Sequence, residues 1–142
     1  MSLLWLLTPT KITAYKVDAP QNVEAVVEKN PLESLSEYPT SEEIKLAINF
    51  ISDKYGWKTL AYSVLIAESG GNPKAENPEW HYDIYGNPIC QGSFGLFQLA
   101  CIHGLKEDLL NPVKNIEIAY ALWKERSWFP WGVCLSGIVK CF

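Results

Sequence analysis

Apolar positions along the chain change their spacing several times, and each change predicts a new element. A first helical pattern begins after Pro39 and ends near residues 55–56. Thr40 and Glu43 have the spacing of a capping box at its start. Its apolar positions, three or four residues apart, are Ile44, Ala47, Ile48 and Ile51.

A second helix is predicted over residues 57–69, and it carries Glu68 in its last turn. The residues before Glu68 are apolar on nearly every side, which is typical of a buried helix. Gly70 and Gly71 favour the left-handed turn that follows a helix, and Pro73 prevents continuation.

Turn residues dominate the stretch 72–91, where residues 80–84 and 88–91 could form a small hairpin. In the stretch 92–99, two glycines bracket the start of an apolar segment that contains one polar residue, Gln98, and the pattern predicts a turn before a buried segment. A short helix is expected over 105–110. Asn111-Pro112 predicts the start of a longer helix that ends near Arg126, because Asn is a good N-cap and proline fits the first turn.

The first 39 residues are interpreted as an extension or linker, and residues 40–142 as the folded domain. Residues 3–7 are strongly apolar but too few to cross a membrane. They could be the remnant of an export signal cleaved near Thr13-Ala14, or equally a strand or a short packing segment.

A net charge of −4 without a basic cluster argues against a nucleic-acid partner. The four cysteines lack a Cys-x-x-Cys pair, which argues against zinc. We predict two disulfides in an exported protein; the most local of three pairings joins Cys90 to Cys101 and Cys134 to Cys141. The alternative is four buried thiols in a cytosolic protein.

Glu68 is the candidate catalytic residue. Its apolar neighbours and the negative end of the helix dipole both disfavour the charged carboxylate, so both raise its pKa. A carboxyl group that keeps its proton near neutral pH is suited to general acid catalysis. The competing interpretation is an ordinary solvated glutamate at a helix end.

Several motifs together resemble the lysozyme-like superfamily, most closely the lytic transglycosylase domains of bacteria and phages. The matching elements, in chain order, are Glu68-Ser69, Asn72-Pro73, Gly95-Leu96-Phe97-Gln98, Asn111-Pro112, Asn115 and Ala119-Tyr120. The resemblance covers roughly residues 40–131. It implies a mainly α fold of the lysozyme-like α+β type, in which a small hairpin or loop subdomain lies beside the active-site cleft.

The resemblance implies that Glu68 protonates the glycosidic oxygen between N-acetylmuramic acid and N-acetylglucosamine. It then takes the proton of the muramic 6-hydroxyl, so that a 1,6-anhydro ring forms. Ser69 would orient Glu68 or the substrate. The other implied substrate-binding residues are Phe94, Gly95, Gln98 and Tyr120. The implied partner is the peptidoglycan glycan strand, bound by a monomer without cofactor, metal or membrane span, in an exported or phage-associated protein.

One departure from related lysozymes affects the expected reaction. Chicken-type lysozymes have an aspartate where this chain has Ser93, and hydrolysis usually needs that second carboxylate. A site with Glu68 as its sole acid favours transglycosylation. Asp83, the only nearby acid that a loop could supply, keeps hydrolysis open as an alternative. A further alternative is a wall-binding module without catalytic activity.

Overall fold

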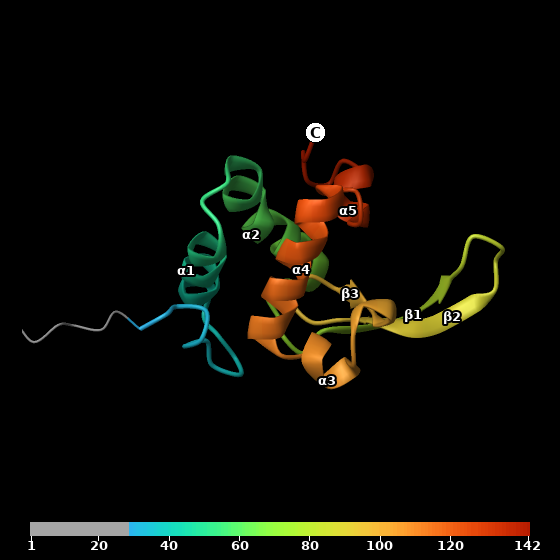
Figure 1. Cartoon of the computed structure of the whole chain (residues 1–142), viewed down its shortest axis with the longest axis horizontal. Coiled ribbons are helices and arrows are strands. Elements are labelled where there is room, and N and C mark those ends of the chain that lie inside the picture. The colour runs from blue at the N-terminus through green and yellow to red at the C-terminus, as the bar shows by residue number, and fades with distance from the viewer. Residues whose placement is uncertain (1–28) are drawn as a thin grey trace, which may run out of the picture.

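The computed structural model describes residues 29–142, in which helices and a small sheet alternate along the chain (Figure 1). The apolar stretch 3–7 and the possible cleavage point at Thr13-Ala14 lie outside the described residues. The helices are α1 (Ser41–Ile51), α2 (Tyr55–Ser69), the 3-10 turn η1 (Cys101–His103), α3 (Lys106–Leu109), α4 (Pro112–Arg126) and α5 (Gly132–Leu135). The strands are β1 (Glu76–Tyr82), β2 (Pro88–Phe94) and β3 (Leu99–Ala100).

The predicted helix starts and ends agree with the structure to within a few residues. The capping box at α1 is formed: the Thr40 backbone N–H donates to the Glu43 carboxylate at 2.7 Å, and the Glu43 N–H donates to Thr40 Oγ1 at 3.3 Å. Gly70 ends α2 with a φ of 66°, and its N–H donates to the carbonyl of Ile66. Asn111 caps α4 through Lys114 N–H at 3.1 Å. However, α1 ends at Ile51, about one turn earlier than expected.

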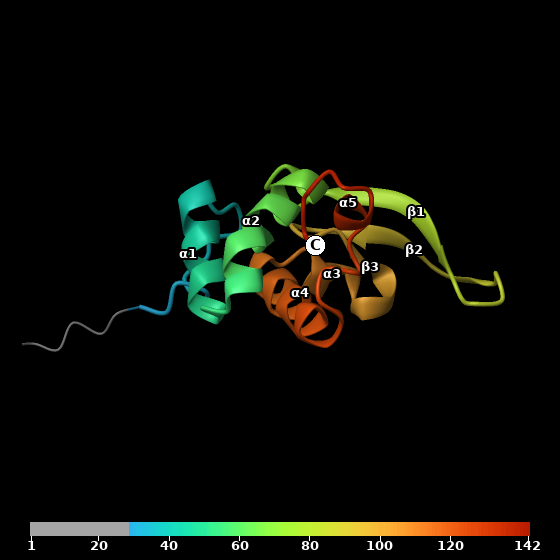
Figure 2. The same ribbon diagram turned by 90° about the horizontal axis from the view of Figure 1, so that it is seen from above.

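The prediction of a mainly α fold is wrong, because the described chain is a mixed α+β structure with a three-stranded antiparallel sheet of order β1-β2-β3. Strands β1 and β2 have seven residues each and form a hairpin that extends away from the helices (Figure 2). The predicted hairpin over residues 80–84 and 88–91 is present, but the start of β1 was missed, since Asn77 and Pro78 suggested a turn. In the structure they lie within the strand.

A bulge explains how β1 accommodates a proline. Asn77 pairs with Ser93 and Trp80 pairs with Gln91, so two residues of β1, Pro78 and Glu79, lie opposite Gly92 alone. Residues in a bulge are left out of the regular ladder, so the missing N–H of Pro78 breaks no expected pair. The bulge also changes the direction in which the following side chains point.

The core lies between α1, α2, α4 and the loop that follows β2. Trp57 of α2 is fully buried at its centre, and its ring stacks on Trp128 with 5.7 Å between ring centroids and 5° between planes. The Trp128 indole N–H donates to the carbonyl of Gly56, and the Trp57 indole N–H donates to that of Ile48. Leu32, upstream of α1, is also buried in this core.

The prediction of two disulfides is confirmed, and of the three pairings that the sequence left open the structure has the most local one. Cys90 of β2 is bonded to Cys101 of η1, and Cys134 of α5 is bonded to Cys141. Two disulfides are consistent with a secreted protein. Across the described helices, none combines the length and the apolar content that crossing a bilayer requires.

The side-chain amide of Asn115 fastens α4 to the loop after β2. Asn115 is buried and makes three hydrogen bonds: Oδ1 accepts from the Phe97 N–H at 2.9 Å, while Nδ2 donates to the carbonyls of Phe94 at 3.0 Å and Leu109 at 2.6 Å. The amide therefore satisfies backbone groups that water cannot reach.

Replacing Asn115 by leucine should strongly destabilise the fold. The substitution leaves one buried N–H and two buried carbonyls unpaired, and each orphaned group costs about 1–3 kcal/mol. We expect a loss of about 3 kcal/mol or more in the free energy of unfolding, measured in urea. Asn49→Ala, an exposed asparagine of α1, is the control and should stay within about 0.5 kcal/mol of wild type. Equal urea midpoints for the two variants would contradict the structural role of Asn115.

Candidate active site

A cleft of about 430 Å³ opens between the end of α2, the sheet and the segment that contains α5, and Glu68 lines it. The carboxyl group reaches the cleft from the last turn of α2, where the apolar residues Val64 and Leu65 are fully buried beside it. Glu68 itself is half-buried. The structure thus places the predicted acid on the wall of a cleft large enough for a small ligand.

The pKa of Glu68 is raised, in the direction that the sequence predicts. Burial is the largest cause, because a half-buried carboxylate loses hydration. The backbone N–H of Val133 acts against this, since it hydrogen-bonds to the carboxylate and lowers the pKa. The negative charge of Glu79 across the cleft raises the pKa further. The net effect favours the protonated form, as a general acid requires.

The opposite wall is built by alternate residues of β1. Asn77, Glu79 and His81 line the cleft, whereas Trp80 and Tyr82, on either side of His81, are exposed on the other face. This period of two brings a carboxylate and an imidazole from the same strand into the cleft. Glu79 is therefore a second acid in the same cleft as Glu68.

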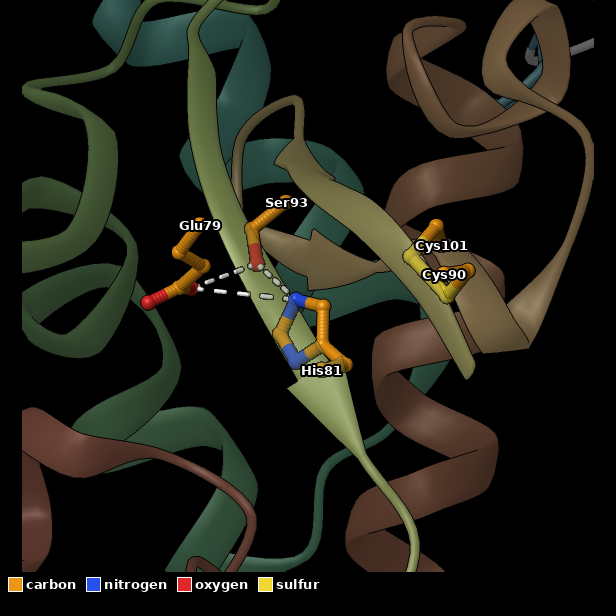
Figure 3. Close-up of a disulfide and its surroundings, with 5 residues drawn as sticks. All are labelled: Glu79, His81, Cys90, Ser93 and Cys101. Carbon is orange, nitrogen blue, oxygen red and sulfur yellow. Dashed lines mark hydrogen bonds and ion pairs between the residues drawn. A yellow bond between two sulfur atoms is a disulfide. The ribbon is translucent and has the colours of Figure 1, made fainter. Parts of the chain in front are cut away.

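Ser93 of β2 connects these two side chains. Its hydroxyl group lies 2.8 Å from Glu79 Oε1 and 3.1 Å from His81 Nε2, and the serine is 3% exposed. His81 Nε2 is also 3.9 Å from Glu79 Oε1. Figure 3 shows the three side chains converging, with the Cys90–Cys101 disulfide on the far side of β2. Position 93 thus holds a serine whose hydroxyl group is hydrogen-bonded to a carboxylate.

The segment around α5 forms a third wall. Trp131, Val133, Ser136 and Ile138 line the cleft there. The Trp131 indole N–H donates to the carbonyl of Phe97 at 3.1 Å, which fixes this wall to the loop after β2. The Cys134–Cys141 disulfide closes the same segment into a small loop. The aromatic stretch 128–131 thus closes the core and lines the cleft at once.

Of the five predicted substrate-binding residues, only Gln98 lines the cleft. Its amide Nε2 donates to the carbonyls of Ala75 and Gly95, so the backbone holds the side chain. Ser69 points elsewhere, because its hydroxyl donates to the carbonyl of Leu96 at 2.7 Å. The Ser69 hydroxyl therefore links the end of α2 to the loop after β2 by a hydrogen bond.

Phe94, Gly95 and Tyr120 also lie outside the lining of the cleft. Phe94 is buried beneath the Lys106 ammonium group, 5.5 Å from the ring centroid. Gly95 has a φ of 75°, and a Cβ there would lie 2.2 Å from the carbonyl oxygen of Leu109. Tyr120 stacks on Trp123. The motif around these residues supports the backbone behind the cleft.

Asp83 lies outside the cleft, at the tip of the hairpin, where it organises the turn. Its carboxylate accepts hydrogen bonds from the backbone N–H groups of Tyr85 and Asn87, both at 2.8 Å, and from Asn87 Nδ2 at 3.0 Å. These bonds, led by that of the Asn87 side chain, lower the pKa of Asp83. The expectation that Asp83 is the nearby second acid is wrong, and Glu79 lies in the cleft instead.

Two histidines in the cleft were not singled out by their sequence context, His81 and His103. His103 of η1 is half-buried, and burial lowers its pKa, as do the charges of Arg126 and His81. The signal for His81 and Glu79 was the alternation of polar and aromatic residues over 79–82. Asn77 and Pro78, which indicate a loop, conceal the strand that this alternation predicts. Within residues 29–142, no group of three or more acidic, histidine or cysteine side chains could hold a metal ion.

Comparisons with known proteins give no family for this chain: no family model, curated protein or solved structure matches it.

Breaking the Cys134–Cys141 disulfide should affect both stability and the acid. In the double variant Cys134→Ala/Cys141→Ala, the loss of a short cross-linked loop should lower the free energy of unfolding by roughly 2–3 kcal/mol. Because Val133 lies next to Cys134 and its N–H lowers the pKa of Glu68, a loosened loop should raise that pKa further. An NMR titration of the Glu68 carboxyl carbon measures the change. An unaltered titration would show that the loop holds its place without the bond.

Glu68→Gln should stabilise the protein more at neutral than at acidic pH. The pKa of Glu68 is raised above the ordinary value of 4.5, so the folded state binds more protons than the unfolded state above that pH. The wild type therefore loses stability as the pH rises from 4.5 through the raised pKa, whereas the amide does not titrate. Urea unfolding of both proteins at about pH 4 and about pH 7 tests this. An advantage of the variant that is the same at both pH values would contradict the raised pKa.

Proposed function

We propose that this protein cleaves the β-1,4 glycosidic bond between N-acetylmuramic acid and N-acetylglucosamine in peptidoglycan, with Glu68 as the general acid. The observation that carries the proposal is a half-buried Glu68 with a raised pKa, facing a second carboxylate, Glu79, across one cleft. Two carboxyl groups in unequal environments are typical of glycosidases. The choice of peptidoglycan rests on the motif resemblance.

Each carboxyl group has a distinct role in this proposal. Glu68, protonated, donates its proton to the glycosidic oxygen as the bond from that oxygen to the muramic C1 breaks. Glu79, whose carboxylate accepts a hydrogen bond from the Ser93 hydroxyl, faces the positive charge that develops at C1. As a carboxylate it can take a proton from the water that attacks C1, or bond to C1 itself. The separation of the two groups selects between these stereochemical routes.

Hydrolysis is the outcome that this geometry supports best. Transglycosylation was expected because Ser93 replaces the second acid of chicken-type lysozymes. The Ser93 hydroxyl is 2.8 Å from the Glu79 carboxylate. The neighbouring strand therefore supplies an acid beside position 93, where the resemblance leads one to expect an aspartate. The second candidate remains the lytic transglycosylase reaction, favoured by the motif resemblance, in which the muramic 6-hydroxyl attacks C1 and Glu68 alone acts as acid and base.

Export is part of the proposal, because peptidoglycan lies outside the cytoplasm. Both disulfides are consistent with the periplasm, the cell wall or the extracellular space, and a phage-associated enzyme would meet the same substrate. The protein is proposed to work as a monomer on glycan strands. Side chains of the cleft, among them Asn77 and Gln98, offer amide groups of the kind that hydrogen-bond to sugar hydroxyls and acetamido groups.

Digestion of purified peptidoglycan sacculi by three variants tests the proposal. Glu68→Gln should lower the rate by about 100-fold or more, since general acid catalysis typically contributes that much. Glu79→Gln should lower it comparably if water is the acceptor, and much less if the 6-hydroxyl is. Glu117→Gln, an exposed glutamate of α4, is the matched control and should digest at the wild-type rate.

Mass spectrometry of the products separates the candidates. Reducing-end muropeptides support hydrolysis, and 1,6-anhydromuropeptides support transglycosylation. Digestion that is undiminished in Glu68→Gln would overturn the assignment of the acid. If neither wild type nor Glu68→Gln digests sacculi but both bind them, the protein is a wall-binding module instead.

A further inference from the structure

The hydrogen-bonded chain His81–Ser93–Glu79 has a direction that the chemistry of its members determines. The Ser93 hydroxyl has a single proton, and a glutamate carboxylate can only accept. The proton of Ser93 therefore lies in the 2.8 Å bond to Glu79 Oε1. The serine oxygen must then accept from its other neighbour, His81 Nε2, at 3.1 Å.

This direction fixes the state of the imidazole. His81 must carry hydrogen on Nε2, which is true of one neutral tautomer and of the doubly protonated ring. If Glu79 were protonated and donated to Ser93, the serine would donate to His81 Nε2 instead, and that nitrogen would need its lone pair. A hydrogen on His81 Nε2 is thus coupled to an ionised Glu79.

We propose that His81 is a positioning residue, which holds the Ser93 hydroxyl so that Ser93 in turn fixes the ionised Glu79 carboxylate opposite Glu68. This inference rests on the proposed function, in which Glu79 is the second carboxylate. Because Ser93 is almost fully buried, its hydroxyl has few alternative partners, so the donor on His81 decides its orientation. Glu79 is half exposed, and without the chain its carboxylate would be free to turn toward solvent.

Three variants separate the hydrogen-bonding role of His81 from the space that its ring fills. His81→Phe removes the donor and keeps an aromatic ring. His81→Gln places an amide Nε2 donor at the same number of bonds from Cα, but that donor does not titrate. Ser93→Ala interrupts the chain at its centre. Tyr82→Phe, on the exposed face of β1, is the control.

With soluble peptidoglycan glycan fragments as substrate, His81→Phe and Ser93→Ala should each lower kcat about tenfold and leave KM within about twofold. His81→Gln should restore kcat to within about threefold of wild type, because it supplies the donor again. Nitrogen NMR of the neutral imidazole should find the hydrogen on Nε2 in wild type.

The outcomes distinguish this inference from the proposed function. If Glu68→Gln abolishes cleavage while His81→Phe and Ser93→Ala cleave at the wild-type rate, the positioning role is overturned and the proposed function stands. If Glu68→Gln cleaves normally, the proposed function falls first. A His81→Gln variant that is as slow as His81→Phe, or a wild-type hydrogen on Nδ1 alone, also overturns the role. Should His81→Phe not fold, Ser93→Ala and His81→Gln still decide the question.

Discussion

A buried amide, that of Asn115, holds together the one loop on which every other part of the cleft depends. It bonds to the backbone of Phe94 and Phe97 from α4, while Ser69 bonds to Leu96 from α2 and Trp131 bonds to Phe97 from the segment before α5. Side chains of three elements thus bond to the backbone within residues 94–97. The close approach is possible because position 95 is glycine, with no room for a Cβ.

This arrangement sets the positions of both cleft walls. The loop ends β2, which carries Ser93, and it lies against the last turn of α2, which carries Glu68. A displacement of the loop would therefore change the separation of Glu68 from Glu79, which in the proposed reaction decides the stereochemical route. Residues that never touch the cleft thus determine its geometry.

The helices and their ends were predictable because local signals decide them: the capping box at Thr40, the glycine after Ser69 and Asn111-Pro112 before α4. Glu68 and its raised pKa were predictable for the same reason. Of the sheet, the hairpin over residues 80–84 and 88–91 was predictable, but the start of β1 was not, since a bulge allows Pro78 to lie inside the strand, and a bulge depends on the partner strand. Glu79 was missed with it, because only strand alternation brings it into the cleft. The roles expected of Ser69, Gly95 and Tyr120 differed because a shared motif does not distinguish residues that bind a ligand from residues that hold the backbone.

The loop closed by the Cys134–Cys141 disulfide makes the environment of Glu68 depend on when this segment folds. Val133, whose N–H reaches Glu68, stands one residue before the bonded Cys134. The surroundings of Glu68 in this structure are thus complete only after residues 131–141 have folded onto the end of α2. If the proposed activity is correct, an acid completed so late would act only once the described chain has folded and the disulfide has formed.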